Sequence, residues 1–284
     1  MIILSQSIVL APKTNPLGTP IFGWRTLVTA GNVSATSEAD GFPASNVANR
    51  ATYQTWKAEG IASPPEDEYL TVAIPENEID PIDYLAVAVH NFGTGQIAVS
   101  VEGASELVGS PADYDWQELV EESIPANDDP IIFRFTPQSL IAIRLRMQPS
   151  LAETPEAPFA GVVYVGKLLV CERGTHADHV PINLARQSEV ENGMSETGQF
   201  VGRMTLRESR STTFALKLLR STWFTTSMQP FLDDAVDNPF FFAWRPEAFP
   251  ADVGFCWLKN DPQPAVHFET GRKAVDLQLG GVTI

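Results

Sequence analysis

Short runs rich in Val, Ile, Phe and Thr recur along this chain, and Pro, Gly, Asn or Asp separates each run from the next. Such runs are typical of β-strands joined by turns. When many strands follow one another with only turns between them, the favoured fold is an antiparallel sandwich or barrel. The expected strands are residues 69–74, 84–90, 96–102, 131–135, 141–148, 161–171, 198–206, 212–219, 239–244, 253–259, 265–269 and 274–279.

Residues 141–147 show the strand pattern most clearly, because Ile, Ile, Leu and Met occupy the odd-numbered positions. The even-numbered positions are Ala142, Arg144 and Arg146. Successive side chains of a strand point to opposite faces, so this run predicts a half-buried strand with Arg144 and Arg146 on its wet face. The best helix candidate is 227–236, and a weaker one lies within 43–49.

Charge divides the 284-residue chain into two unequal parts. Residues 1–172 carry 8 basic and 22 acidic residues, a net charge of −14, whereas residues 173–284 carry 11 and 13, a net charge of −2. The polar, irregular segment 173–181 is typical of a linker. We therefore expect two mainly β domains, an antiparallel sandwich of the jelly-roll type over 1–172 and a β-domain with one short helix over 173–284. One domain of two packed sheets is the alternative.

The overall composition argues against several classes of partner. The net charge of −16 disfavours nucleic acid, which requires clustered Lys and Arg. No run approaches ~18 uninterrupted apolar residues, so no membrane span is expected. The first six residues lack a secretory signal pattern. Two cysteines, Cys171 and Cys256, are expected to be buried and free, although a bridge between them is conceivable.

Catalytic and metal-binding patterns are weak. The chain has no Gly-x-Ser-x-Gly, no His-Glu-x-x-His and no Walker loop, so it is not expected to be an enzyme or to need a cofactor. A hydrolase would need a compact pair of carboxylates, and nothing in the sequence singles one out. If zinc binds, its ligands would be Cys171, His176, Asp178 and His179. A polar linker explains that cluster better, and the acidic runs have no EF-hand spacing.

The first part of the chain resembles galactose-binding-like domains of the discoidin or coagulation-factor C type. The resemblance starts with the Ser-rich stretch 33–37, the turn Pro43-Ala44-Ser45-Asn46 and the pair Tyr53 and Trp56 around Thr55. It continues through 84–90, Trp116, 141–147 and 162–168. It implies a jelly-roll sandwich whose ligands meet the loops at one end. The residues that would contact a sugar there are Trp56, Lys57, His90, Asn91 and Phe92, and a purely structural role is the alternative.

The second part is similar to distal-tail and baseplate proteins of tailed bacteriophages. The similarity rests on the helix candidate beside Pro239-Phe240-Phe241-Phe242 and on the amphipathic closing run 275–279. It implies a ring of copies, a hexamer or trimer, in contact with tube, hub and fibre proteins. Independently, the consecutive aromatic residues require both strand faces to be covered. We expect a neighbouring subunit to bury part of an interface made by Phe240, Phe241, Phe242 and Trp244, with a second domain of the same chain as the alternative.

Together these patterns favour a structural protein of a phage tail tip, made in the host cytoplasm and carried in the virion. Its first domain would attach fibres or touch a cell-surface glycan. The rival hypothesis is a carbohydrate-binding module that serves a partner glycoside hydrolase.

Overall fold

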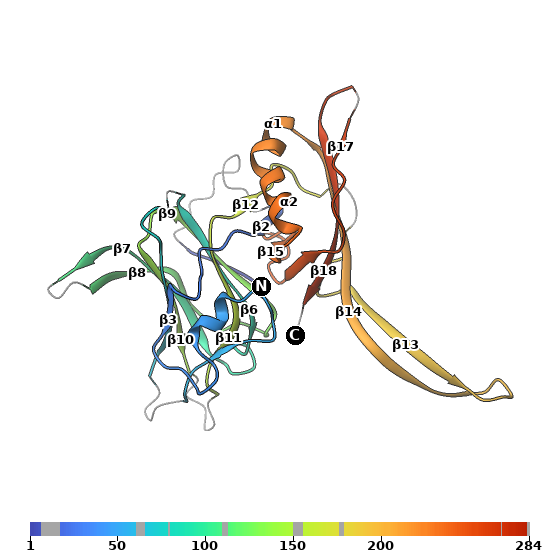
Figure 1. The fold of residues 1–284 in the computed structure, drawn as a ribbon, viewed down its shortest axis with the longest axis horizontal. Coiled ribbons are helices and arrows are strands. Elements are labelled where there is room, and N and C mark those ends of the chain that lie inside the picture. The colour runs from blue at the N-terminus through green and yellow to red at the C-terminus, as the bar shows by residue number, and fades with distance from the viewer. Residues whose placement is uncertain are drawn as a thin grey trace.

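The computed structural model describes residues 1–6, 18–60, 66–78, 80–109, 113–149, 156–175, 179–267 and 269–282. The fold is mainly β, with three sheets and a short helical segment (Figure 1), which confirms the expected fold class. No helix in these ranges is long and apolar enough to cross a bilayer.

Two five-stranded sheets form the first body. The first sheet has the order β1 (Ile2–Leu4), β9 (Ile131–Gln138), β6 (Ile82–His90), β11 (Phe159–Gly166) and β4 (Trp56–Lys57). The second sheet has the order β3 (Val33–Ala35), β5 (Glu68–Ala73), β10 (Ala142–Gln148), β7 (Ala98–Val108) and β8 (Asp113–Ser123). All pairings are antiparallel except β1 with β9, and one hydrophobic core lies between the sheets.

Strand β10 shows how the sequence positions this core. Ile143, Leu145 and Met147 are fully buried, whereas Arg144 and Arg146 lie on the outer face, as the alternation predicts. The pattern is wrong at the start of the run, because Ile141 is 37% exposed and the strand begins at Ala142. The short helical segment expected within 43–49 is the 3₁₀ turn η1 (Ala44–Ala48).

The third sheet joins both parts of the chain. Its order is β12 (Leu169–Val170), β2 (Ile21–Gly23), β15 (Phe240–Ala243), β16 (Val253–Leu258), β18 (Lys273–Val282), β14 (Phe200–Leu219) and β13 (Arg186–Met194), with β17 (Ala265–Val266) paired to β18. Strands β2 and β12 come from the first 172 residues, so this sheet is not built by 173–284 alone. The division into two domains at residue 172 stays a prediction.

One continuous helical segment packs on the third sheet. It comprises α1 (Ser221–Trp223), the π-helical η2 (Phe224–Met228) and α2 (Gln229–Ala235), and therefore begins six residues before the expected helix. Phe231 contacts Phe22 and Phe240 with ring centroids 4.5 and 5.0 Å apart. The apolar face of the helix thus covers one side of the sheet.

Strand β15 is buried on both faces by this chain itself. Phe240 and Phe242 belong to the core under the helix, and Phe241 belongs to a separate core between the first and third sheets. These three side chains are 0–3% exposed, and the Tyr164 hydroxyl donates to the Pro239 carbonyl oxygen at 2.9 Å across the seam. Trp244 is partly buried and donates from Nε1 to Asp252 Oδ2. The expectation that a neighbouring subunit buries this strand is therefore corrected, because the chain's own first sheet covers it.

Two ribbons project from opposite sides of the molecule (Figure 1). One is the β7–β8 hairpin. The other, here called the arm, is the β13–β14 hairpin over residues 186–210, where β14 runs on as a single 20-residue strand instead of the two expected strands. The arm extends well beyond the rest of the third sheet.

Candidate functional site

The residues predicted to contact a sugar lie at one end of the sandwich, and most of them are buried. Trp56, His90, Asn91 and Phe92 are at most 5% exposed, and only Lys57 is exposed. The Trp56 indole Nε1 donates to the Ser37 carbonyl oxygen at 2.9 Å. The ring therefore fixes the turn from inside and offers no surface to a ligand.

His90 and Asn91 also have structural partners. Phe92 N donates to His90 Nδ1 at 3.3 Å, and His90 Nε2 lies 3.0 Å from the Asp129 carbonyl oxygen, which defines a neutral imidazole protonated on Nε2. Burial lowers the pKa of His90 to about 4. The Asn91 side chain bridges Ala157 O and Phe159 N at 3.0 Å each. The expected sugar platform is corrected, since four of its five side chains are buried and only Lys57 is exposed.

The proposed zinc ligands fall partly outside the described residues, which omit His176 and Asp178. Cys171 is fully buried, and its burial raises the pKa of the thiol. His179 Nδ1 lies 3.0 Å from the Thr213 carbonyl oxygen. Within the described ranges no three His, Cys, Asp or Glu side chains are arranged to hold a metal ion, and Cys171 and Cys256 are not bonded to each other.

A different cluster, here called the arginine–aromatic face, covers the outer side of the second sheet. It comprises Asp67, Tyr69, Glu102, Tyr114, Trp116, Arg144 and Arg146. Arg144 and Arg146 project from β10, at the centre of the sheet, because the strand turns its apolar positions inward. The partners come from β5, β7 and β8, and from the residue before β5.

Arg144 is the centre of this face. Its guanidinium carbon lies 4.1 Å from the ring centroids of both Tyr69 and Trp116, and its Nε is 2.5 Å from Glu102 Oε2. A guanidinium held over aromatic faces gains a cation–π attraction in addition to its ion pair. The Tyr114 ring continues the row, 5.1 Å from Trp116.

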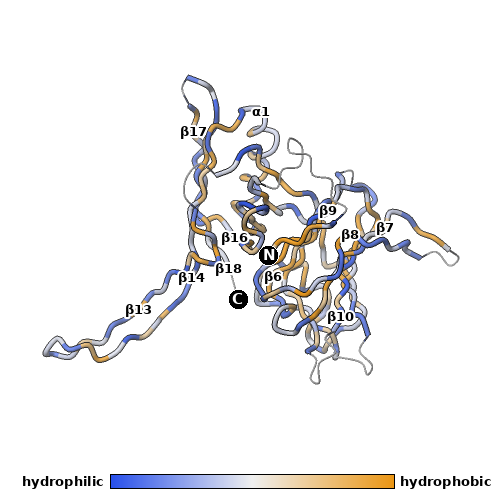
Figure 2. Tube along the Cα trace, turned by 180° about the vertical axis from the view of Figure 1, so that it is seen from behind, coloured by the Kyte–Doolittle hydropathy of each residue, from blue (hydrophilic) through white to orange (hydrophobic). Residues whose placement is uncertain are grey.

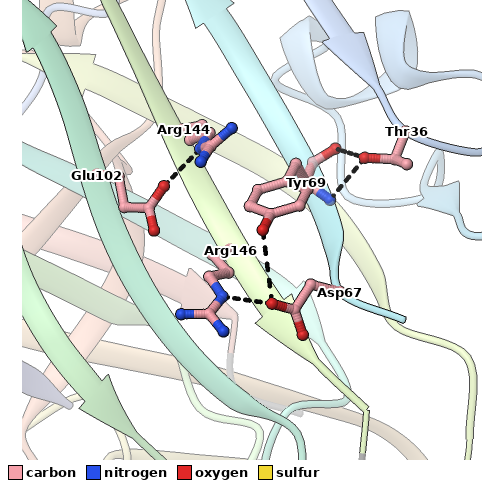
Figure 3. A network of polar contacts seen from close by, with 6 residues as sticks. All are labelled: Thr36, Asp67, Tyr69, Glu102, Arg144 and Arg146. Atoms are coloured by element: carbon pink, nitrogen blue, oxygen red, sulfur yellow. Dashed lines mark hydrogen bonds and ion pairs between the residues drawn. The ribbon is translucent and has the colours of Figure 1, made fainter. Parts of the chain in front are cut away.

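Arg146 forms the second ion pair, with its Nε 2.6 Å from Asp67 Oδ2. That hydrogen bond raises the pKa of Arg146, and burial raises the pKa of Tyr69. Figure 3 shows Tyr69 between the two arginines, with its hydroxyl directed at Asp67 and its backbone bonded to Thr36. In the same view the terminal nitrogens of Arg146 point away from Asp67. Each arginine thus has an ion pair through Nε, and in Arg146 the terminal nitrogens are directed away from that partner.

A groove of about 430 Å³ adjoins this face, and Tyr114 contributes to both. Apolar side chains form part of the lining, together with three hydroxyls and two carboxylates. The lining residues are Ala73, Ile74, Pro75, Glu76, Glu78, Ser105, Leu107, Tyr114, Ser139, Leu140 and Ile141. A lining that combines an aromatic ring, apolar side chains and a few hydrogen-bonding groups is typical of small-ligand sites.

The arm is the other unusual surface. Five large apolar side chains along the arm are 53–71% exposed, namely Met194, Phe200, Val201, Met204 and Leu206. The apolar stretches are visible along the arm in Figure 2. Its base carries Arg186, Arg207 and Arg210, which line a groove of about 490 Å³ together with Trp257.

Half of the chain is similar to solved β-sandwich structures. A chitosan-binding module from a Paenibacillus chitosanase/glucanase shares 12% identity at a TM-score of 0.39, covering 51% of this chain and 99% of that one. A family-32 carbohydrate-binding module from a Clostridium perfringens family 31 glycoside hydrolase shares 14% identity at 0.37, covering 49% and 94%. Allantoicase from Saccharomyces cerevisiae shares 13% identity at 0.35, covering 52% and 43%. No family model and no curated protein matches the chain.

Proposed function

We propose that this chain is a carbohydrate-binding protein that takes a neutral glycan on the arginine–aromatic face and in the adjoining groove. The observation that carries the proposal is Arg144, held between two aromatic rings with its Nε on Glu102. A preorganised set of rings, guanidinium donors and carboxylate acceptors on a partly exposed sheet face supports binding of a ligand that is apolar on one side and rich in hydroxyls at its edges.

The chemistry of a pyranose matches that requirement. Its C–H face packs against rings such as Tyr114 and Trp116, and its hydroxyls accept from guanidinium nitrogens and donate to carboxylates. Two arginines and two acids balance one another on the face, while Glu76 and Glu78 add negative charge in the groove. That balance favours a neutral sugar over an anionic one. We propose binding and no catalysis.

A glycan array followed by calorimetry on the full chain tests the proposal. Trp116→Ala and Tyr114→Ala are expected to lower the affinity for a neutral glycan at least about tenfold, the equivalent of ~1.4 kcal/mol, because each removes a ring from the row. Tyr53→Ala is the matched control, since Tyr53 is 79% exposed at the loop end of the sandwich. Equal binding by all variants, with circular dichroism showing intact folds, would contradict the proposal.

A second candidate function is favoured by the arm. We propose that the chain is also a structural protein that assembles in many copies. The assembly that we propose is a phage tail tip, because the second part of the chain resembles distal-tail and baseplate proteins. An isolated two-stranded ribbon is at best marginally stable in water, and this one exposes five large apolar side chains. A partner that covers the arm would stabilise the ribbon and would also bury its apolar side chains.

Sedimentation of the full chain tests this second function. The expected result is a concentration-dependent oligomer, and a variant with the arm shortened at the facing pair Val190 and Thr205 is expected to remain monomeric. A wild-type chain that stays monomeric would contradict an assembly function and leave carbohydrate binding untouched.

A further inference from the structure

The groove at the base of the arm, here called the basal groove, concentrates positive charge in a chain whose net charge is −16. It has a volume of about 490 Å³. Its lining residues are Arg186, Arg207, Glu208, Ser209, Arg210, Trp257, Gly281 and Val282. Three arginines thus share the lining with a single carboxylate. A groove lined mainly by charges of one sign attracts ligands of the opposite sign.

Two of these arginines are placed where they repel each other. Arg186 on β13 and Arg210 on β14 are direct partners in the strand register. Like charges directly opposite each other on neighbouring strands destabilise a sheet. Glu208 lies 3.4 Å from Arg186, but both side chains are at least half exposed, so solvent weakens this ion pair. A bound anion would offset the repulsion that remains.

Arg207 has donors available for such an anion. Among the described residues it has no hydrogen-bond or ion-pair partner, whereas Arg210 donates to the Asn183 carbonyl oxygen. The Arg207 side chain is also exposed. A guanidinium carries N–H donors in a planar fork that matches both oxygens of a carboxylate. Arg207 is therefore the arginine of the groove best placed to bind a carboxylate directly.

An aromatic ring completes the basal groove. Trp257 on β16 is the register partner of Gly280 on β18, and a Cβ on Gly280 would lie 2.7 Å from Trp257 Cε2. The indole therefore lies against bare backbone on one side, while the residue remains 42% exposed. Ser209 adds a hydroxyl to the same lining. An indole held in this way offers its free side to the apolar face of a ligand.

We propose that the basal groove binds an acidic sugar, with its ring packed on Trp257 and its carboxylate bound by Arg207. A sugar acid combines the C–H face, the hydroxyls and the negative charge that this lining matches. An acidic peptide would also satisfy the arginines, but the lining offers only Trp257 and Val282 as large apolar partners for its other side chains. The basal groove shares no residue with the arginine–aromatic face, and this inference depends on neither function proposed above.

The net negative charge of the chain does not prevent this binding. At physiological ionic strength the Debye length is about 8 Å, so exposed charges farther away are largely screened. The charges of the groove itself then determine the attraction. Because that attraction also lies at the surface, the affinity for an acidic sugar is expected to fall as ionic strength rises.

Calorimetry on the full chain with trigalacturonate, a short sugar acid, tests the site. The wild type is expected to bind this acid at least about tenfold more tightly than its methyl ester, which has the same rings without the charge. Arg207→Gln and Trp257→Ala are each expected to lower the affinity for the acid about tenfold. The matched control, Arg203→Gln, removes the same charge from an exposed position of the same strand outside the groove and is expected to bind normally.

The outcomes separate this site from the arginine–aromatic face. Loss in both groove variants, with normal binding by Arg203→Gln and Trp116→Ala and unchanged circular dichroism, supports the proposal. No binding, equal binding of acid and ester, or equal loss in Arg203→Gln and Arg207→Gln overturns it. Tighter binding of a poly-glutamate peptide through Arg207 would overturn it in favour of a peptide site. Loss in Trp116→Ala alone would overturn it and leave the proposed carbohydrate function standing.

Discussion

The role of a residue in this protein depends more on its burial than on its residue type. Trp56 and Trp116 are both tryptophans in the first body, yet Trp56 is fully buried with its indole bonded to Ser37, whereas Trp116 lies over Arg144 on the outer face. The sequence predicted a sugar site that includes Trp56, although its ring is buried, because side-chain type does not reveal which side of a turn a ring occupies. Trp116 was noted in the sequence, but its partners Tyr69 and Arg144 come from distant strands.

His90 gives the clearest residue-level prediction. Its pKa is about 4 in the folded chain against 6.5 when unfolded, so the unfolded state binds more protons between those values. Its contribution to stability is therefore present above pH 6.5 and is lost as pH falls toward 4, by an amount on the order of 3 kcal/mol. Urea titrations at several pH values, compared with His90→Gln, measure it. A variant whose pH dependence equals that of the wild type would contradict the neutral, buried assignment.

Asp83 affects stability with the opposite pH dependence. It accepts from Leu168 N at 2.7 Å, and burial raises the pKa of its carboxyl from 3.8 to about 6. The folded state binds more protons between those values, so this group adds stability as pH falls and that gain is gone above about pH 6. Asp83→Asn is expected to remove this dependence in the same titrations. A variant with an unchanged slope between pH 4 and 6 would count against it.

Strands and helices were the features of the structure that the sequence predicted best. The alternation over 141–147 placed Arg144 and Arg146 on the wet face, and the helix was expected within a few residues of where it lies. Strand β8 was missed because charged residues interrupt its pattern, and β14 was divided because Arg207–Arg210 break the apolar run. The arginine–aromatic face could not be predicted, since its register depends on pairings among four strands.

Two glycines in strands test the packing of the third sheet. A Cβ on Gly254 would lie 2.3 Å from Ile182 Cγ2, whereas a Cβ on Gly202 in the arm would meet nothing within 4 Å. Gly254→Ala is expected to lower the unfolding free energy by about 1–3 kcal/mol through overpacking. Gly202→Ala is expected to be neutral. Thermal melts of both variants measure this difference. Equal melting temperatures would contradict the prediction and show that Ile182 moves aside without loss of stability.

The whole molecule is held together by a seam that the sequence did not indicate. Strand β2 pairs with β15, and Phe241 packs with Tyr164 and Phe255 between the first and third sheets. The consecutive aromatic residues of β15 indicated that both its faces need cover, and a neighbouring subunit was expected to supply it, with a second domain of the same chain as the alternative; the chain itself covers both faces. A long-range pairing between residues 21–23 and 241–243 leaves no local signal.

This seam predicts that residues 173–284 do not fold alone. Without β2 they lose Phe22, which contacts Phe231 and Phe242 with centroids 4.5 and 5.0 Å apart. The expected result is a fragment without cooperative thermal unfolding, whereas the full chain unfolds cooperatively. A fragment that melts in a single sharp transition would instead support a domain boundary near residue 172.

The most direct measurement follows the six tryptophan indole N–H signals by NMR while a neutral glycan chosen from the array is added to the full chain. If the outer face of the second sheet binds the sugar, the Trp116 signal shifts with saturation and the Trp56 signal stays in place. A shift of Trp56 with Trp116 unchanged would place the ligand at the loop end and contradict the account.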